Sequence, residues 1–339
     1  MKGKCGSIGC WVGELPKGCE LCMRGLKSVI FVTGVCPDNC FYCPISYQKK
    51  GKDVTYINES KVRSEKDLIL EACACGSRGA SMTGGDPIAR LDRTIRYIGI
   101  LKSFFGSSFH IHLYTSGTLL TDDAMNKLVK AGLDEIRVHI IGKRSWGALR
   151  TALKYPISVG IENPVIPGTE DLLKDIIVRA YELGVNFINL NELEFSETNQ
   201  YQLRLRGIKP AEDGASALGS KETAIRILKW VEEEGLAISV HYCPASFKDK
   251  VQFKSRMLRR AKITRRVYEE VTSEGLVLWA ETPVNSPAIR ELKLKNLAFH
   301  AGDVVRIHPV VAKSLGGKVR FVEAYPADPR KVLNTWFRD

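Results

Sequence analysis

The sequence has no long hydrophobic run and no apolar leader. None of its apolar stretches approaches the ~20 residues that a membrane-spanning helix needs. The opening residues, Met1-Lys-Gly-Lys-Cys-Gly, carry no apolar core of a signal peptide. Internal repeats and low-complexity tracts are missing as well. We therefore expect a cytoplasmic protein with no membrane partner.

Acidic residues are scarce relative to basic ones. The 339 residues include 38 Asp and Glu against 50 Lys and Arg, which gives a net charge of +12. Such a charge favours an anionic partner, such as RNA, DNA, a phosphorylated substrate or an acidic protein surface, without selecting among them. Apolar residues make up 44% of the chain and charged residues 26%, which excludes disorder as the dominant state. At roughly 150 residues per domain, the length indicates one large α/β domain with additions, or two domains.

Strand-like segments alternate with helix-like segments over the first 245 residues. The strand-like segments cover residues 28–33, 80–83, 109–115, 135–141, 157–161, 186–190 and 237–242. Four helix-like stretches between them end at glycine, a frequent helix stop: Gly76, Gly132, Gly184 and Gly235. This alternation indicates parallel strands linked by crossover helices, in an open doubly wound sheet or a partial barrel. In both architectures the ligand site lies at the C-terminal ends of the strands.

The pattern changes after residue 247. Residues 248–271 predict one long helix, with nine Lys and Arg between 248 and 266. That surface could bind phosphate or nucleic acid, or could simply be solvated. From residue 276 onward the chain predicts short strands and turns, without an RNP-like aromatic motif. We therefore divide the chain into a Cys-rich metal-binding segment (1–25), a barrel (26–247), a basic helix (248–275) and a small β-rich C-terminal domain (276–339).

Seven of the ten cysteines lie within the first 43 residues. In a cytosolic chain, cysteines are better read as metal ligands or reactive thiols than as disulfides. Cys36, Cys40 and Cys43 form a C-x3-C-x2-C motif directly after the first predicted strand. Three thiolates can hold a cubane [4Fe-4S] cluster, which normally takes four cysteines, and leave one iron open to an amine and a carboxylate. Part of a zinc site is the alternative.

The motif C36PDNC40FYC43, together with Gly84-Gly85-Asp86-Pro87 after the second strand, resembles the radical SAM superfamily. The chain is more closely similar to the group related to pyruvate formate-lyase activating enzymes. It is also similar to the methanogen radical SAM arginine methylases of methyl-coenzyme M reductase. The resemblance implies an α/β fold with a partial (β/α)6 barrel. It also implies a [4Fe-4S] cluster that cleaves S-adenosylmethionine (SAM) reductively to a 5′-deoxyadenosyl radical.

The same resemblance implies roles for individual residues. Cys36, Cys40 and Cys43 would ligate the cluster, and Tyr42 would contact the adenine. Gly84, Gly85 and Asp86 match the turn that receives the methionine amine, although the family usually has Glu at the third position. Polar residues at the ends of the third and sixth strands could bind the ribose and the carboxylate: Thr115, Ser116, Asn191 and Glu192.

A second cysteine group precedes the first strand. Cys5, Cys10, Cys19 and Cys22 have the spacing C-x4-C-x8-C-x2-C. Four thiolates within 18 residues suit a closed tetrahedral zinc site or a second, auxiliary iron–sulfur cluster. Free thiols in a flexible leader are the alternative.

We therefore predict a radical SAM enzyme, of transferase or oxidoreductase type, that modifies a macromolecule: RNA or a protein side chain. Methylation is one candidate reaction, and ferredoxin or flavodoxin is a candidate electron donor. The alternatives are an activase that generates a glycyl radical on a partner enzyme, and a non-catalytic, zinc-stapled nucleic-acid-binding protein. The sequence has no D-x-H-x-x-G signature, so nothing supports cobalamin as a cofactor, unless it is held another way.

Overall fold

The computed structural model describes residues 3–6, 9–284, 289, 292, 297–315 and 318–338. Its contacts divide the chain into two compact units. The first comprises Met1–Cys73 and Ser77–Gln252, and the second comprises Ala74–Gly76 and Phe253–Asp339. Among the described residues, we find no helix with the length and apolar character needed to cross a bilayer.

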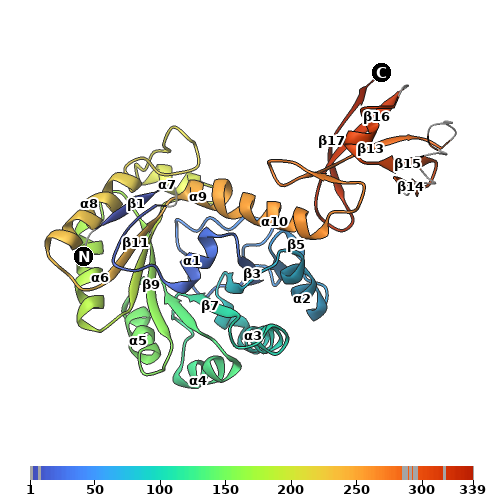
Figure 1. Cartoon of the computed structure of the whole chain (residues 1–339). Coiled ribbons are helices and arrows are strands. Elements are labelled where there is room, and N and C mark those ends of the chain that lie inside the picture. The colour runs from blue at the N-terminus through green and yellow to red at the C-terminus, as the bar shows by residue number, and fades with distance from the viewer. Residues whose placement is uncertain are drawn as a thin grey trace. The chain divides into compact units, whose positions relative to one another are not determined.

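The first unit is built on seven neighbouring parallel strands (Figure 1). In spatial order these are β3 (Lys27–Thr33), β6 (Gly79–Gly84), β7 (His110–Thr115), β8 (Glu135–Val138), β9 (Ser158–Val165), β10 (Phe187–Glu192) and β11 (Ser239–Cys243). Spatial order follows chain order, as expected when each crossover helix returns the chain beside the preceding strand. The sheet curves into a partial barrel, which confirms the predicted fold class.

Six crossover helices connect these strands: α2 (Glu65–Ala74), α3 (Leu91–Phe105), α4 (Asp122–Ala131), α5 (Lys143–Ala152), α6 (Glu170–Glu182) and α8 (Ser220–Glu233). Helix α4 shows how the sequence sets their limits. The Thr121 side chain accepts a hydrogen bond from the Ala124 amide at its start, and Gly132, with φ of 106°, ends it. Helix α5 was not predicted, because Gly142 before it gives no capping side chain and Gly147 weakens its pattern.

The main core lies between the sheet and these helices. In β8, Ile136 and Val138 are fully buried members of that core. Glu135 and Arg137 alternate with them and therefore point to the other side of the sheet, into the barrel. Because strand side chains alternate in this way, the outer face is apolar and the interior carries charged groups.

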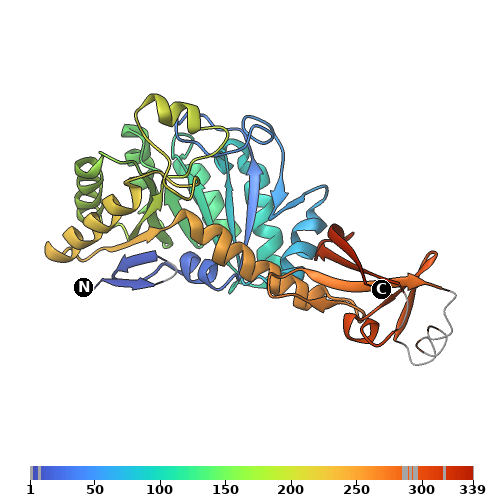
Figure 2. The same ribbon diagram turned by 90° about the horizontal axis from the view of Figure 1, so that it is seen from above.

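Short N-terminal elements extend the sheet and occupy one end of the barrel. The hairpin of β1 (Lys4–Gly6) and β2 (Gly9–Val12) adds to β11 in antiparallel register. Helix α1 (Lys17–Met23) packs its Leu21 against Gly79, the first residue of β6. Figure 2 shows α1 and the loop that follows β3 at opposite ends of the strands. At the other edge of the sheet, β4 (Tyr56–Ile57) pairs with β3, and β5 (Ser60–Lys61) pairs with β4.

The predicted helix over residues 248–271 is wrong in extent. The chain forms a short turn, α9 (Ala245–Phe247), a π-helical stretch, η2 (Lys248–Phe253), and then α10 (Lys254–Thr264). Arg265, with φ of −58° and ψ of 141°, ends α10 because its backbone is extended. The segment that follows includes a strand, β12 (Glu270–Val271).

The second unit contains an antiparallel sheet with the order β14-β15-β13-β16-β17, and β12 pairs with β13. Its further strands are β13 (Val277–Pro283), β14 (Ala298–Ala301), β15 (Val304–Ile307), β16 (Val319–Tyr325) and β17 (Lys331–Arg338), and α12 covers Pro309–Ala312. These elements confirm the predicted β-rich C-terminal region. Within this region, residues 285–288, 290–291, 293–296, 316–317 and 339 lie outside the described residues.

Candidate functional site

The loop after β3 carries the three cysteines of the C-x3-C-x2-C motif. All three are free thiols; Cys36 is exposed and Cys40 and Cys43 are half-buried. The Cys43 amide donates to the Cys40 carbonyl oxygen at 3.1 Å, which folds this part of the loop into a tight turn. Within the described residues, no three His, Cys, Asp or Glu side chains lie close enough together to hold a single metal ion. A cubane cluster binds each cysteine at a separate iron, so three accessible thiols on one loop fit such a cluster.

Tyr42 is fixed by contacts on both its side chain and its backbone. Its hydroxyl lies 2.7 Å from His139 Nε2, and His139 Nδ1 lies 2.8 Å from the Glu162 carbonyl oxygen. A carbonyl can only accept, so Nδ1 carries the proton and the Tyr42 hydroxyl donates to Nε2. Burial lowers the pKa of His139, which favours this neutral ring. The Tyr42 carbonyl accepts from the Asn199 side chain at 2.9 Å.

The glycine turn after β6 lies against the cysteine loop. The Gly85 amide donates to the Thr33 carbonyl at 2.7 Å, and the Asp86 amide donates to the Val35 carbonyl at 2.9 Å. A Cβ atom on Gly85 would lie 2.4 Å from the Val35 oxygen. Gly84 has φ of 144°, in the region that favours glycine. Glycine is therefore required here for the two segments to approach.

Asp86, Thr115 and Ser116 are brought together, as an internal cluster. The Asp86 carboxylate is fully buried. It accepts from the hydroxyls of Thr115 and Ser116 at 2.9 and 3.0 Å, from the Ser116 amide at 3.1 Å, and from the Ile88 amide at 2.9 Å. Burial raises the pKa of Asp86 despite these donors. In this structure the Asp86 side chain joins the ends of β6 and β7, and its contact with a methionine amine stays a prediction.

Asn191 and Glu192, at the end of β10, contact different groups. Asn191 Nδ2 donates to Glu162 Oε1 at 2.9 Å, within the barrel. Glu192 Oε2 accepts from the Ala245 amide at 2.7 Å, at the start of α9. The structure therefore does not bring these two residues together with the Asp86 cluster through any described contact.

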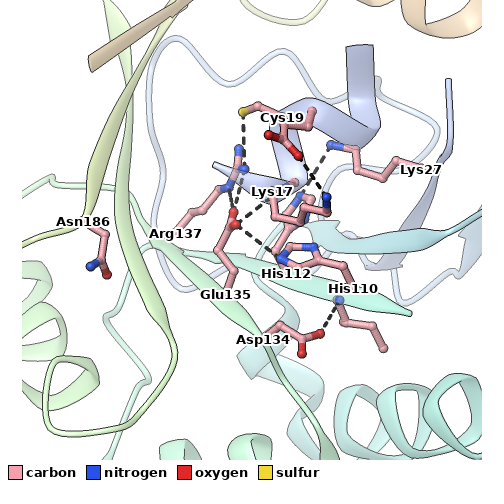
Figure 3. A network of polar contacts seen from close by, with 12 residues as sticks. Lys17, Cys19, Lys27, His110, His112, Asp134, Glu135, Arg137 and Asn186 are labelled. Atoms are coloured by element: carbon pink, nitrogen blue, oxygen red, sulfur yellow. Dashed lines mark hydrogen bonds and ion pairs between the residues drawn. The ribbon is translucent and has the colours of Figure 1, made fainter. Parts of the chain in front are cut away.

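A charged network inside the barrel was missed in the sequence analysis (Figure 3). Arg137 is fully buried and donates to Glu135 at 2.6 Å, to Glu162 at 2.9 Å, and to the Cys19 sulfur at 3.4 Å. Burial opposes ionisation of Glu135, but the Arg137 charge lowers the pKa of this carboxyl to about 2. The one local sign was the strand Glu135–Val138, in which two charged residues alternate with two apolar residues.

The second cysteine group is divided by the structure. Cys5 and Cys10 are cross-strand neighbours in the hairpin and form a disulfide, so our expectation of unpaired cysteines is wrong for this pair. Cys19 and Cys22 instead line an interior cavity of about 70 Å³, which Cys243 also lines. Burial disfavours the Cys19 thiolate, but Arg137 and His241 lower the pKa of the thiol to about 7. Because disulfide sulfurs do not ligate zinc or a cluster, the predicted site of four thiolates is incompatible with this disulfide, and a metal-ligand role stays a prediction for Cys19 and Cys22 only.

Comparisons with known proteins agree with this architecture. The profile of the radical SAM superfamily matches residues 30–141, which include the cysteine loop and the glycine turn. A protein of Methanocaldococcus jannaschii, named "Putative glycyl-radical enzyme activating enzyme", is 38% identical over 278 residues, which are 78% of this chain and 72% of that protein. The PqqA peptide cyclase of Bradyrhizobium diazoefficiens is 30% identical over 129 residues, or 38% of this chain and 31% of that protein.

Among solved structures, the chain is similar to Streptococcus suis SuiB bound to S-adenosylmethionine, with a TM-score of 0.47 and 11% identity. The match covers 65% of this chain and half of the SuiB chain. The partial barrel and the cysteine loop, together with the family match, define an enzyme of the α/β class. The chain belongs to the radical SAM superfamily.

Proposed function

We propose that Cys36, Cys40 and Cys43 bind a [4Fe-4S] cluster and that SAM binds beside it, at the ends of the strands. The observation that carries this proposal is the set of three free thiols on one loop, which is hydrogen-bonded to the glycine turn after β6. When bound, the cluster supplies the electron that cleaves SAM to methionine and a 5′-deoxyadenosyl radical. An external donor, such as reduced ferredoxin or flavodoxin, would then reduce the cluster again.

The protein's own residues would position the cofactors and exclude water. His139 holds the Tyr42 hydroxyl and thereby fixes the ring that would contact the adenine. Gly84 and Gly85 let the turn approach Thr33 and Val35, so that it lies beside the cysteine loop. Asp86 is fully engaged with Thr115 and Ser116, so we assign it to holding the turn in place.

We propose that the substrate is a macromolecule and that it is a protein. The support is the M. jannaschii relative, whose name describes an enzyme that activates another enzyme. Generation of a glycyl radical on a partner and methylation of a protein side chain are both compatible with a radical formed at this site. RNA is the second candidate, favoured by the net charge of +12. Product analysis distinguishes the three: a backbone glycyl radical, a methylated side chain or a modified nucleoside.

The first test is cofactor content and SAM cleavage in anaerobically reconstituted protein. We expect about four irons per chain from the cluster and release of 5′-deoxyadenosine after addition of dithionite and SAM. Cys40→Ala should lose both. Cys73→Ala removes an exposed free cysteine outside the loop and should lose neither. A wild-type protein that contains zinc alone and releases no nucleoside would refute the proposal. Metal retained in Cys40→Ala would instead indicate the additional site predicted among the N-terminal cysteines.

A further inference from the structure

The second unit has an open sheet edge. Strand β17 pairs with β16 on one side, and no other described strand pairs with it. All eight of its residues are exposed. An edge of this kind presents main-chain N–H and C=O groups that can pair with another strand.

The central part of the edge lacks two of the features that usually prevent such pairing, charge and proline. Residues 332–337 read Val-Leu-Asn-Thr-Trp-Phe, with no charge and no proline. Its four apolar side chains are between 40% and 59% exposed: Val332, Leu333, Trp336 and Phe337. Sheet edges that must stay free commonly carry charges, prolines or bulges. The register shift here falls opposite Glu323 and Ala324, which leaves residues 334–338 in regular pairing.

A groove of about 380 Å³ lies on the sheet face and reaches this edge. Trp336 stacks on Phe321 with ring centroids 5.7 Å apart, and this pair forms part of the groove wall. Leu278 and Pro309 add apolar surface, and the charged residues of the lining are Lys313, Arg338 and Glu270. An apolar side chain of an added strand fits this groove. A row of phosphates fits it less well, because five of its eight lining residues are apolar.

Charge indicates the kind of strand that fits. Residues 253–339 contain 17 Lys and Arg against 9 Asp and Glu. Lys331 and Arg338 stand at the two ends of β17. If two copies of the chain paired these edges about a two-fold axis, the strands would be antiparallel and Lys331 would face Arg338. Like charges placed opposite each other disfavour that pairing, whereas a strand with acidic ends would complement both.

We propose that the outer edge of β17 binds an extended, acidic-ended segment of another protein by β-strand addition, with an apolar side chain in the groove. Main-chain hydrogen bonds would provide affinity, and the groove and the flanking cations would provide selectivity. The inference rests on the proposed function only for the idea that the bound partner protein is the substrate.

The test uses fluorescence anisotropy on the full chain with three labelled probes. The first is a ten-residue peptide with two glutamates at each end and alternating valine and threonine between them. The second has lysines in place of the glutamates, and the third is a uridine decanucleotide. We expect the acidic peptide to bind at least about tenfold more tightly than the lysine peptide, because like charges across an interface are costly.

Two variants locate the binding. Leu333→Glu places a negative charge on the edge, and Phe337→Ser removes an exposed ring. Each should weaken acidic-peptide binding by about tenfold. Leu172→Ser changes an equally exposed residue of α6 and should change nothing, and thermal unfolding checks that all variants fold. Three results would overturn the proposal: no binding of the acidic peptide, equal or tighter binding of either other probe, or a dimer in solution that the β17 variants dissociate. SAM cleavage is measured separately, so its absence refutes the proposed function and leaves this result standing.

Discussion

At the residue scale, Arg137 compensates the charges of two carboxylates inside the barrel. Its guanidinium is shared between Glu135 and Glu162; Arg137 and Glu135 are buried, and the Glu162 side chain is 14% exposed. Removing one partner of a buried ion pair costs about 3–5 kcal/mol, because the remaining charge is left uncompensated. We therefore expect Arg137→Met to lower the free energy of unfolding by about 3 kcal/mol at pH 7. Urea denaturation measures this value, and Arg226→Met, which breaks an exposed pair with Glu170, should cost less than about 1 kcal/mol.

The pH dependence of this effect has a definite sign. The folded-state pKa of Glu135, about 2, lies below its ordinary value of 4.5. The wild-type ion pair therefore contributes fully above pH 4.5, and its contribution is lost as the pH falls toward 2. In Arg137→Met the pKa values of the unpaired carboxyls should rise, so these groups become protonated on acidification. The stability gap between wild type and variant should thus be smaller at pH 4.5 than at pH 7. A gap that is independent of pH would show that the arginine acts by packing alone.

The cysteine loop and the Arg137 network differ in how far they could be predicted from sequence. Cys36, Cys40 and Cys43 lie within eight residues, so a local motif reveals them. Arg137 and Cys19 are 118 positions apart and meet only because α1 occupies the end of the barrel. The same applies to Tyr42 and His139, which are 97 positions apart. Nothing local in the sequence records such contacts.

At the element scale, the turn after β6 determines where the cysteine loop lies. Gly85→Ala would place a Cβ 2.4 Å from the Val35 carbonyl oxygen, so the segment that leads into Cys36 must move. We expect this variant to keep its fold but to lose most of its iron and its 5′-deoxyadenosine production. Gly99→Ala is the matched control, because Gly99 lies in α3 with open space around its Cα. That control should retain both and gain up to about 1 kcal/mol of stability. Full iron content in Gly85→Ala would show that the loop tolerates the shift.

Elements with strong local signals were predicted well. Strand β3 follows from its run of β-branched residues, and α4 follows from its Thr121 cap and its Gly132 stop. The hairpin of β1 and β2 was not predicted, because such short strands are defined by their pairing with β11 rather than by their own pattern. Helix α10 ends earlier than predicted, since the run of basic residues continues past the point where the backbone becomes extended.

At the scale of the whole molecule, the proposed chemistry and the proposed docking fall in different units. The cysteine loop, the glycine turn and the Arg137 network all belong to the first unit, and β17 belongs to the second. If each unit performs its part independently, variants should separate the two activities. We expect Leu333→Glu to leave SAM cleavage without a substrate unchanged and to weaken acidic-peptide binding by about tenfold, because like charges repel. Cys40→Ala should abolish cleavage and leave peptide binding unchanged. Anisotropy and nucleoside release, measured on the same preparations, check both expectations. If Cys40→Ala also weakened peptide binding, the two units would be coupled through the cluster loop, and the independence argued here would be wrong.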